Sequence, residues 1–168
     1  MNLRFLSIVA VVALVAACES PSTAKKEEAA GGAAAAQNPP AAAAQAPSVV
    51  PGSQQDFVAN VGDRVFFDFD KSELRPDARS TLAKWVAFLK KYPNDKLTVE
   101  GHCDERGTVE YNLGLGDRRA TAVKNFLMAE GIDAGRLKTI SYGKSRPAVL
   151  GHNEGAWSQN RRGVGVIQ

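Results

Sequence analysis

Four segments of the chain alternate between apolar and polar residues. They are residues 63–70 (DRVFFDFD), 95–104 (DKLTVEGHCD), 137–143 (LKTISYG) and 162–168 (RGVGVIQ). Successive side chains of a β-strand point to opposite faces of the sheet, so this alternation is typical of strands with one buried face and one wetter face. In the first segment the apolar positions are Val65, Phe67 and Phe69. We therefore expect four strands.

Two segments between these strands space their apolar residues as a helix does. The first covers residues 77–92, follows Pro76 and is stopped by Pro93, and proline is favoured in the first turn of a helix. The second begins at about residue 109 or 112, runs to residue 130 and is ended by Gly131. The positions that we expect to face the core are Leu82, Trp85, Val86, Leu89, Leu115, Val123, Leu127 and Met128.

The order of these elements predicts the fold class. It is strand, helix, strand, helix, strand and a final strand, with one short helical turn expected at residues 155–162. Such an order describes an α/β protein, more narrowly an α+β sandwich, in which helices pack on one face of a mixed four-stranded sheet. The alternation within the strands agrees, because it implies one buried and one wetter face of the sheet.

The first residues of the chain follow a different pattern. Arg4 precedes an apolar run over residues 5–15, which is too short to span a membrane but long enough for the core of an export signal. The run leads into Val15-Ala16-Ala17-Cys18, which resembles the bacterial lipobox. We predict a lipoprotein signal peptide at residues 1–17 and acyl chains on Cys18, which would anchor the chain in a membrane. The alternative is an ordinary export signal with an incidental cysteine.

Residues 18–55 are low in complexity and rich in alanine and proline. Gly31, Gly32 and four prolines interrupt every alanine run, and nothing bulky is present to bury, so we expect a disordered tether. Residues 56–168 have the length and the apolar content of one globular domain.

Charge and cysteine content narrow the classes of function. The net charge is +3, and the lysines and arginines are scattered, which is too weak a signal for nucleic-acid binding. The chain has two cysteines, Cys18 and Cys103. If Cys18 carries lipid, Cys103 has no partner in the chain, and the core must hold the domain without a disulfide.

One short stretch, residues 101–123, holds most of the candidate chemistry. His102 and Cys103 could belong to a metal site together with His152, or form a nucleophile with its base. Neighbouring side chains on a strand point in opposite directions, so His102 and Cys103 do not suit either role. A buried histidine and a small buried cysteine on the inner face of the sheet explain them better.

The same stretch also suggests recognition of charge. Asn112, Leu115 and Arg119 recur at three- and four-residue steps and so share one helix face, and Asp104 lies where the preceding strand ends. An arginine beside the core stripe is costly unless a carboxylate meets it. Two hypotheses stay open. Either Asp104 and Arg119 form an internal salt bridge, or they are held apart to bind the ammonium and the carboxylate of a zwitterion.

Three motifs carry a resemblance to a known family. VFFDFDKSELRPDA, TVEGHCDERGTVEYNLGLGDRRATAVKNFL and SYGKSRPAVLGHNEGAWSQNRR together resemble the OmpA-like C-terminal domain family over residues 61–168. The family's helix signature is met by Asn112, Leu115, Gly116, Arg119, Ala120 and Val123. Many members have serine where this chain has Gly116, and we expect this difference to loosen the helix slightly.

The resemblance implies a ligand and a set of residues that bind it. The ligand would be the diaminopimelate side chain of the peptidoglycan stem peptide, which ends in an amino-acid zwitterion. Asp104 and Arg119 would be the main clamp, and we expect that losing either removes most of the binding and leaves the fold intact. The remaining residues of the site would be Phe69, Asp70, Arg106, Thr108, Asn112 and Leu115. Phe69 could instead be a core aromatic, Asp70 could cap a loop and Thr108 could cap the second helix.

The resemblance further implies an anchor that is not an enzyme and needs no cofactor. Lipid on Cys18 would hold the outer membrane, while the domain faces the periplasm and binds peptidoglycan noncovalently. The implied partners are peptidoglycan, TolB and the other Tol proteins, whose system acts in envelope integrity and cell division, with no nucleic acid. Two alternatives remain: a wall anchor in another envelope or motor complex, which would need an uncleaved spanning helix, and a metal-dependent wall hydrolase using His102, Cys103 and His152.

Overall fold

A mixed sheet of four strands organises the part of the chain that the computed structural model describes, residues 49–168. The predicted signal peptide, the Cys18 lipid site and most of the predicted tether lie outside these residues. The elements in chain order are α1 (Gln54–Asn60), β1 (Arg64–Phe66), α2 (Pro76–Lys91), β2 (Leu97–His102), α3 (Val109–Ala129), a 3₁₀ turn (Ala134–Arg136), β3 (Leu137–Gly143), α4 (Glu154–Asn160) and β4 (Arg162–Ile167).

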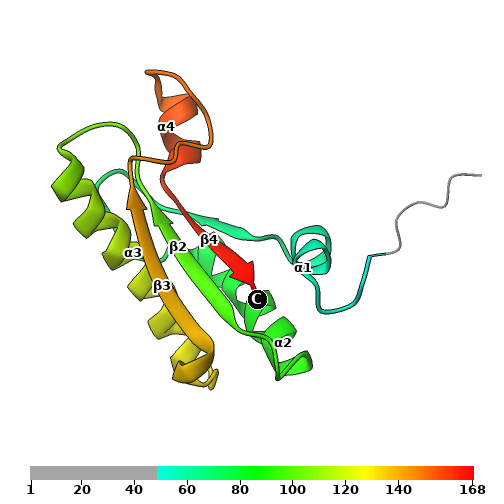
Figure 1. The fold of residues 1–168 in the computed structure, drawn as a ribbon. Helices are drawn as coiled ribbons and strands as arrows, with labels where there is room; N and C mark the ends of the chain where they lie inside the picture. Colours follow the sequence, from blue (N-terminus) through cyan, green and yellow to red (C-terminus); the bar gives the residue numbers. More distant parts are fainter. Residues whose placement is uncertain (1–48) are drawn as a thin grey trace, which may run out of the picture. The chain divides into compact units, whose positions relative to one another are not determined.

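The sheet has the strand order β1-β4-β2-β3. β2 and β3 are parallel, with Leu97 opposite Leu137, whereas β4 runs antiparallel to both β1 and β2. Figure 1 shows α2 and α3 on the same side of this sheet. The predicted fold class, helices packed on one face of a mixed four-stranded sheet, is confirmed.

The core lies between the sheet and these two helices. Trp85 on α2 is fully buried and donates its ring N–H to the carbonyl of Gly62 at 2.7 Å. The predicted core positions on α2 and α3 are buried with one exception, Met128, which is 41% exposed because it lies outside the buried stripe near the end of α3. No helix among residues 49–168 is long and apolar enough to cross a membrane.

The first strand is shorter than the sequence pattern predicted. β1 ends at Phe66, and the amide of the buried Phe67 still bonds the carbonyl of Arg161 at 2.9 Å. The chain then turns, and Asp70 adopts a left-handed conformation with φ of 55°. Phe69 therefore belongs to a loop and is 56% exposed, so its assignment to a strand was wrong and it is not a core aromatic.

One helix was not expected from the sequence. α1 includes Gln54 and Gln55, which the sequence pattern placed in the tether. The side chain of Ser53 caps it by accepting the amide of Asp56 at 3.2 Å, and Phe57 is fully buried against Trp85. The side chain of Gln54 pairs with β4 by accepting the amide of Ile167 and donating to the carbonyl of Gly165.

Two glycines let α3 cross β2 at very short range. A Cβ atom added at Gly101 would lie 1.8 Å from the backbone oxygen of Gly116. A Cβ at Gly116 would in turn meet the hydroxyl of Ser141 at 2.4 Å and the oxygen of Gly101 at 3.0 Å. Gly116 therefore serves the close packing of helix on sheet, which differs from the expected loosening of the helix.

Candidate functional site

The loop between β2 and α3, residues 103–108, frames the site. Its first residue, Cys103, continues the pairing with β3 through a bond from its amide to the carbonyl of Gly143 at 2.8 Å. The chain then turns where the amide of Arg106 bonds the carboxylate of Asp104 at 3.1 Å. Gly107 follows with φ of 89°, a conformation that side chains rarely allow.

Hydrogen bonds from the first turn of α3 hold this loop in place. Thr108 is the N-cap of α3, and its hydroxyl accepts the amide of Tyr111 at 3.1 Å. The side-chain amide of Asn112 donates to the carbonyls of Arg106 and Thr108 at 2.7 and 2.9 Å. Asn112 thus binds the loop to the helix, and Thr108 has the capping role that the sequence left open.

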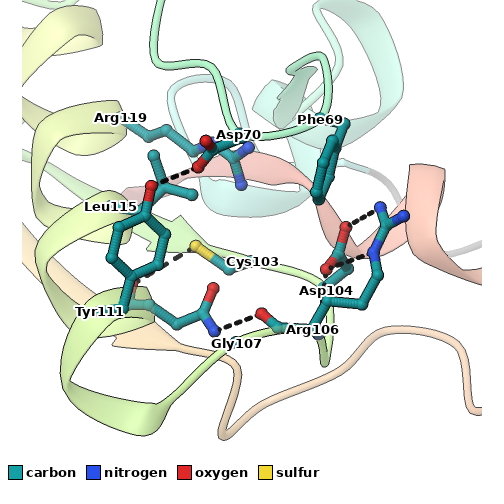
Figure 2. A pocket seen from close by; sticks show the side chains of 10 residues that line it. Phe69, Asp70, Cys103, Asp104, Arg106, Gly107, Tyr111, Leu115 and Arg119 are labelled. Atoms are coloured by element: carbon teal, nitrogen blue, oxygen red, sulfur yellow. Dashed lines mark hydrogen bonds and ion pairs between the residues drawn. The ribbon is translucent and has the colours of Figure 1, made fainter.

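A cavity of about 160 Å³ opens between this loop, α3 and the loop after β1 (Figure 2). Seven of the eight predicted ligand residues line it, and Thr108 is the exception. The complete lining is Phe69, Asp70, Cys103, Asp104, Arg106, Gly107, Tyr111, Asn112, Leu115 and Arg119.

Asp104 is almost fully buried, with 4% of its surface exposed, and it is paired with arginines. Arg106 donates to its two oxygens at 3.2 and 2.6 Å, and Arg161 on the far side approaches at 3.4 Å. Burial alone would raise the pKa of the Asp104 carboxyl, but the hydrogen bonds from Arg106 and Arg161 outweigh it and hold the pKa below its usual range. The carboxylate is therefore charged at neutral pH.

Arg119 has no exposed surface and is bound by backbone carbonyls. It donates to the oxygens of Lys71 and His102 at 2.8 Å and to that of Asp68 at 3.0 Å. Burial lowers its pKa, but a guanidinium keeps its proton. Three of its five N–H groups are used in this way, and the side chain also lines the cavity.

The two charged groups are held apart. The ion-pair partners of Asp104 are Arg106 and Arg161, so the internal salt bridge between Asp104 and Arg119 is not formed. Figure 2 shows Arg119 and Asp104 on opposite sides of the cavity. This arrangement presents an acid and a base to one small space, with Leu115 and Phe69 as apolar wall.

Comparison with known proteins identifies the family. The profile of the OmpA family matches residues 66–161. The chain belongs to the OmpA family.

Two proteins from other bacteria are similar to most of this chain. The peptidoglycan-associated lipoprotein of Agrobacterium fabrum is 56% identical over 122 residues, which cover 73% of this chain and 69% of the relative. That of Brucella melitensis is 52% identical over 122 residues, covering 73% of each chain.

Two solved structures share the fold of this chain. The peptidoglycan-associated lipoprotein of Burkholderia pseudomallei is 40% identical with a TM-score of 0.62, over 63% of this chain and 90% of that one. The C-terminal domain of Helicobacter pylori MotB has a TM-score of 0.59 at 19% identity, over 63% and 84% of the two chains, which shows the fold alone.

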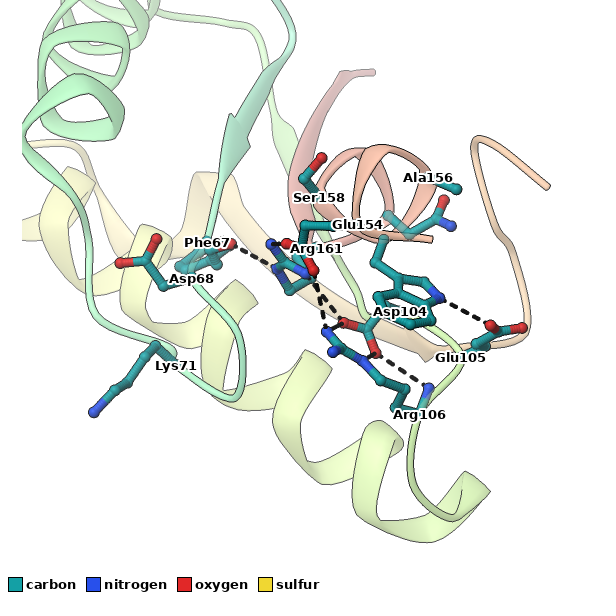
Figure 3. A network of polar contacts seen from close by, with 12 residues as sticks. Phe67, Asp68, Lys71, Asp104, Glu105, Arg106, Glu154, Ala156, Ser158 and Arg161 are labelled. Atoms are coloured by element: carbon teal, nitrogen blue, oxygen red, sulfur yellow. Dashed lines mark hydrogen bonds and ion pairs between the residues drawn. The ribbon is translucent and has the colours of Figure 1, made fainter. Parts of the chain in front are cut away.

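Sequence reasoning missed several residues of this OmpA-family site. Tyr111 lines the cavity and donates its hydroxyl to the carboxylate of Asp70, a bond that raises the pKa of Tyr111. Arg161 pairs with both Asp104 and Glu154 (Figure 3). Tyr111 carries a weak signal, because it directly precedes Asn112 in the recognised motif. Nothing in the sequence indicates that Arg161 reaches the loop after β2.

The residues considered for a metal or a nucleophile do not converge. The ring of His102 lies beside that of Tyr142, with ring centres 5.5 Å apart and the planes tilted by 34°. The thiol of Cys103 faces α3 and donates to the carbonyl of Asn112 at 3.4 Å. His152 is exposed and bonds the carboxylate of Glu105 at 2.7 Å. Within residues 49–168, no three His, Cys, Asp or Glu side chains lie close enough to hold a metal ion.

His102 should make the stability of the domain depend on pH. Burial, reinforced by the charges of Arg162 and Arg146, lowers its pKa from 6.5 to about 4, although Glu100 lies 3.5 Å away. The unfolded chain takes up this proton near pH 6.5 and the folded chain only near pH 4, so stability falls as pH falls between these values. We expect a loss of about 2 kcal/mol between pH 7 and pH 5, measured by urea unfolding.

The control for this prediction is the other histidine. His102→Gln should remove most of the loss between pH 7 and pH 5, while His152→Gln, at an exposed position, should retain it. An unchanged pH profile in His102→Gln would contradict the assignment.

Proposed function

We propose that this chain is an outer-membrane lipoprotein that binds peptidoglycan noncovalently through diaminopimelate and is not an enzyme. In this proposal, lipid on Cys18 anchors the chain to the outer membrane, and the folded domain faces the periplasm. The anchor tethers the outer membrane to the cell wall as part of the Tol–Pal system, with TolB and other Tol proteins as partners. Envelope integrity and cell division are the processes served.

The observation that carries the proposal is the separated acid and base in one cavity. The free end of diaminopimelate has an ammonium and a carboxylate on one carbon, so it needs one partner of each sign within a short distance. The guanidinium of Arg119 lines the cavity, and a guanidinium suits a carboxylate. The charged Asp104 suits the ammonium, and its pair with Arg106 holds the carboxylate in place. Phe69 and Leu115 offer the methylene chain an apolar wall.

The similar proteins support the wider role. The curated relatives at 52–56% identity are named peptidoglycan-associated lipoproteins, and the predicted lipobox at Cys18 agrees with such a name. The similarity to MotB concerns the fold alone, so a role in a motor complex has no comparable support.

The proposal is tested by co-sedimentation of the purified chain with sacculi that contain diaminopimelate. Asp104→Asn keeps the shape of the side chain and removes the charge, and we expect it to weaken binding at least about tenfold. Asp117→Asn is the matched control, because Asp117 is an exposed aspartate on α3 that does not line the cavity. Thermal unfolding of both variants separates loss of binding from loss of fold.

Competition identifies the chemical group that is bound. Free diaminopimelate should displace the chain from sacculi, whereas pimelate, which lacks both amino groups, should not. Equal displacement by the two compounds, or equal retention of Asp104→Asn and wild type, would refute binding of the zwitterion by this cavity.

A further inference from the structure

The guanidinium of Arg106 lies between two aromatic rings. Its central carbon is 3.9 Å from the ring centre of Phe69 and 4.1 Å from that of Trp157. Phe69 belongs to the loop after β1, whereas Trp157 belongs to α4, so two distant parts of the chain meet at this side chain. A cation over an aromatic face at this distance is attracted by the ring, and the attraction grows where water is excluded.

The ring of Trp157 is itself anchored. Its N–H donates to the carboxylate of Glu105 at 2.8 Å, and the same carboxylate binds His152 at 2.7 Å. The first turn of α4 is capped by the side chain of Asn153, which accepts the amide of Ala156 at 3.0 Å. The indole therefore has a fixed orientation on a capped helix, which makes it a firm support for a neighbouring side chain.

The remaining edge of the Arg106 guanidinium meets Asp104. One Nη atom lies 2.6 Å from a carboxylate oxygen, and Glu154 approaches the same group at 3.9 Å (Figure 3). Two rings on its faces and one carboxylate at its edge confine a side chain that would otherwise sample many rotamers. Its position at the rim of the cavity is set by these groups together.

Trp157 does not belong to the main hydrophobic core. It is half-buried and lies outside the large cluster of buried apolar residues between the sheet and the helices. We propose that Trp157 is a positioning residue of the binding site, which holds the Arg106 guanidinium against Asp104 at the cavity rim through ring stacking and the Glu105 anchor. The consequence for ligand affinity rests on the function proposed above, while the positioning itself does not.

The first experiment needs no ligand. In nuclear magnetic resonance spectra of the purified full chain, the Nε proton of Arg106 should be shifted by the ring current of Trp157. Trp157→Ala should move this signal toward that of an exposed arginine, and Trp157→Phe, which keeps a ring but loses the N–H bond to Glu105, should restore only part of the shift. An unmoved signal in Trp157→Ala would overturn the proposal. If that variant does not fold, Glu105→Ala removes the anchor and should move the signal in the same direction.

The second experiment measures affinity for a soluble muropeptide that contains diaminopimelate. Trp157→Ala should weaken binding about fivefold, and Trp157→Phe, which keeps a ring but loses the bond to Glu105, should weaken it about two- to threefold. In an Arg106→Ala background, Trp157→Ala should cause no further loss, because its effect passes through Arg106. An equal loss in both backgrounds would show a merely structural role and overturn the proposal.

The outcomes separate the two proposals. Failure of the wild type to bind the muropeptide would refute the proposed function and with it the effect of Trp157 on affinity. A wild type that binds, with Trp157→Ala binding equally well, would refute only the role of Trp157. If Arg106→Ala abolishes measurable binding, the resonance experiment decides.

Discussion

Replacing Arg119 by alanine is expected to lower the free energy of unfolding by about 3–5 kcal/mol and to abolish binding to diaminopimelate-containing wall. The guanidinium is fully buried and satisfies three carbonyls, those of Asp68, Lys71 and His102. Alanine would leave these oxygens without a partner and open a void, and both effects destabilise a folded protein. Urea unfolding followed by circular dichroism measures the change.

The neighbouring arginine provides the control. Arg118 is exposed on the same helix, with Tyr111 5.9 Å from its guanidinium as its aromatic neighbour. Arg118→Ala should change stability by less than about 0.5 kcal/mol. The sequence predicted that the fold survives the loss of Arg119, and the buried position predicts the opposite. Equal stability of the two variants would show that the sequence-based expectation was correct.

Substituting Gly101 by alanine is expected to destabilise the domain by at least about 3 kcal/mol. The added methyl group would lie 1.8 Å from the backbone oxygen of Gly116. A Cβ atom and a backbone oxygen have no rotamer that could relieve the clash. The helix α3 would therefore have to move away from β2 where the two cross. The midpoint of thermal or urea unfolding reports the effect.

Gly114 is the matched control for this substitution. It lies on α3, the helix that crosses Gly101, and its added Cβ would meet only the guanidinium of Arg118 at 3.5 Å, an ordinary contact. Gly114→Ala should therefore stabilise the domain by about 0.5–1 kcal/mol, because alanine favours helix. A stable Gly101→Ala variant would contradict the close crossing of α3 over β2.

The fold was largely predictable because its elements have strong periods and clear ends. Pro76 marks the first residue of α2, and alternation located β2, β3 and β4 to within a few residues. The end of β1 was not predictable, since Phe69 continues the alternation and only the turn at Asp70 removes it from the strand. α1 was missed because its seven residues bury a single side chain, Phe57.

Many residues of the candidate site could be predicted from the sequence, but the side chains with which they pair could not. The position of Asp104 and the spacing of Asn112, Leu115 and Arg119 indicated four of the residues that line the cavity. The family resemblance supplied Phe69, Asp70 and Arg106. The partners of these groups come from distant segments, as when Arg161 reaches Asp104 and Trp157 covers Arg106. Such pairs depend on how the sheet brings α4 beside the loop after β2, which a local pattern does not contain.

α1 and the cavity lie at opposite ends of the strands, which determines how the domain would respond to a pulling force. The side chain of Gln54 hydrogen-bonds to Gly165 and Ile167 of β4, which lie opposite the beginning of β2. The cavity lies beyond the other end of β2. A force applied between residue 49 and a particle held in the cavity would therefore run along the strands. It would load the hydrogen bonds from β1 to β4 and from β4 to β2 in shear, so that the bonds of a strand pair must break together. Under tension, the unfolding rate should govern how long the domain stays intact.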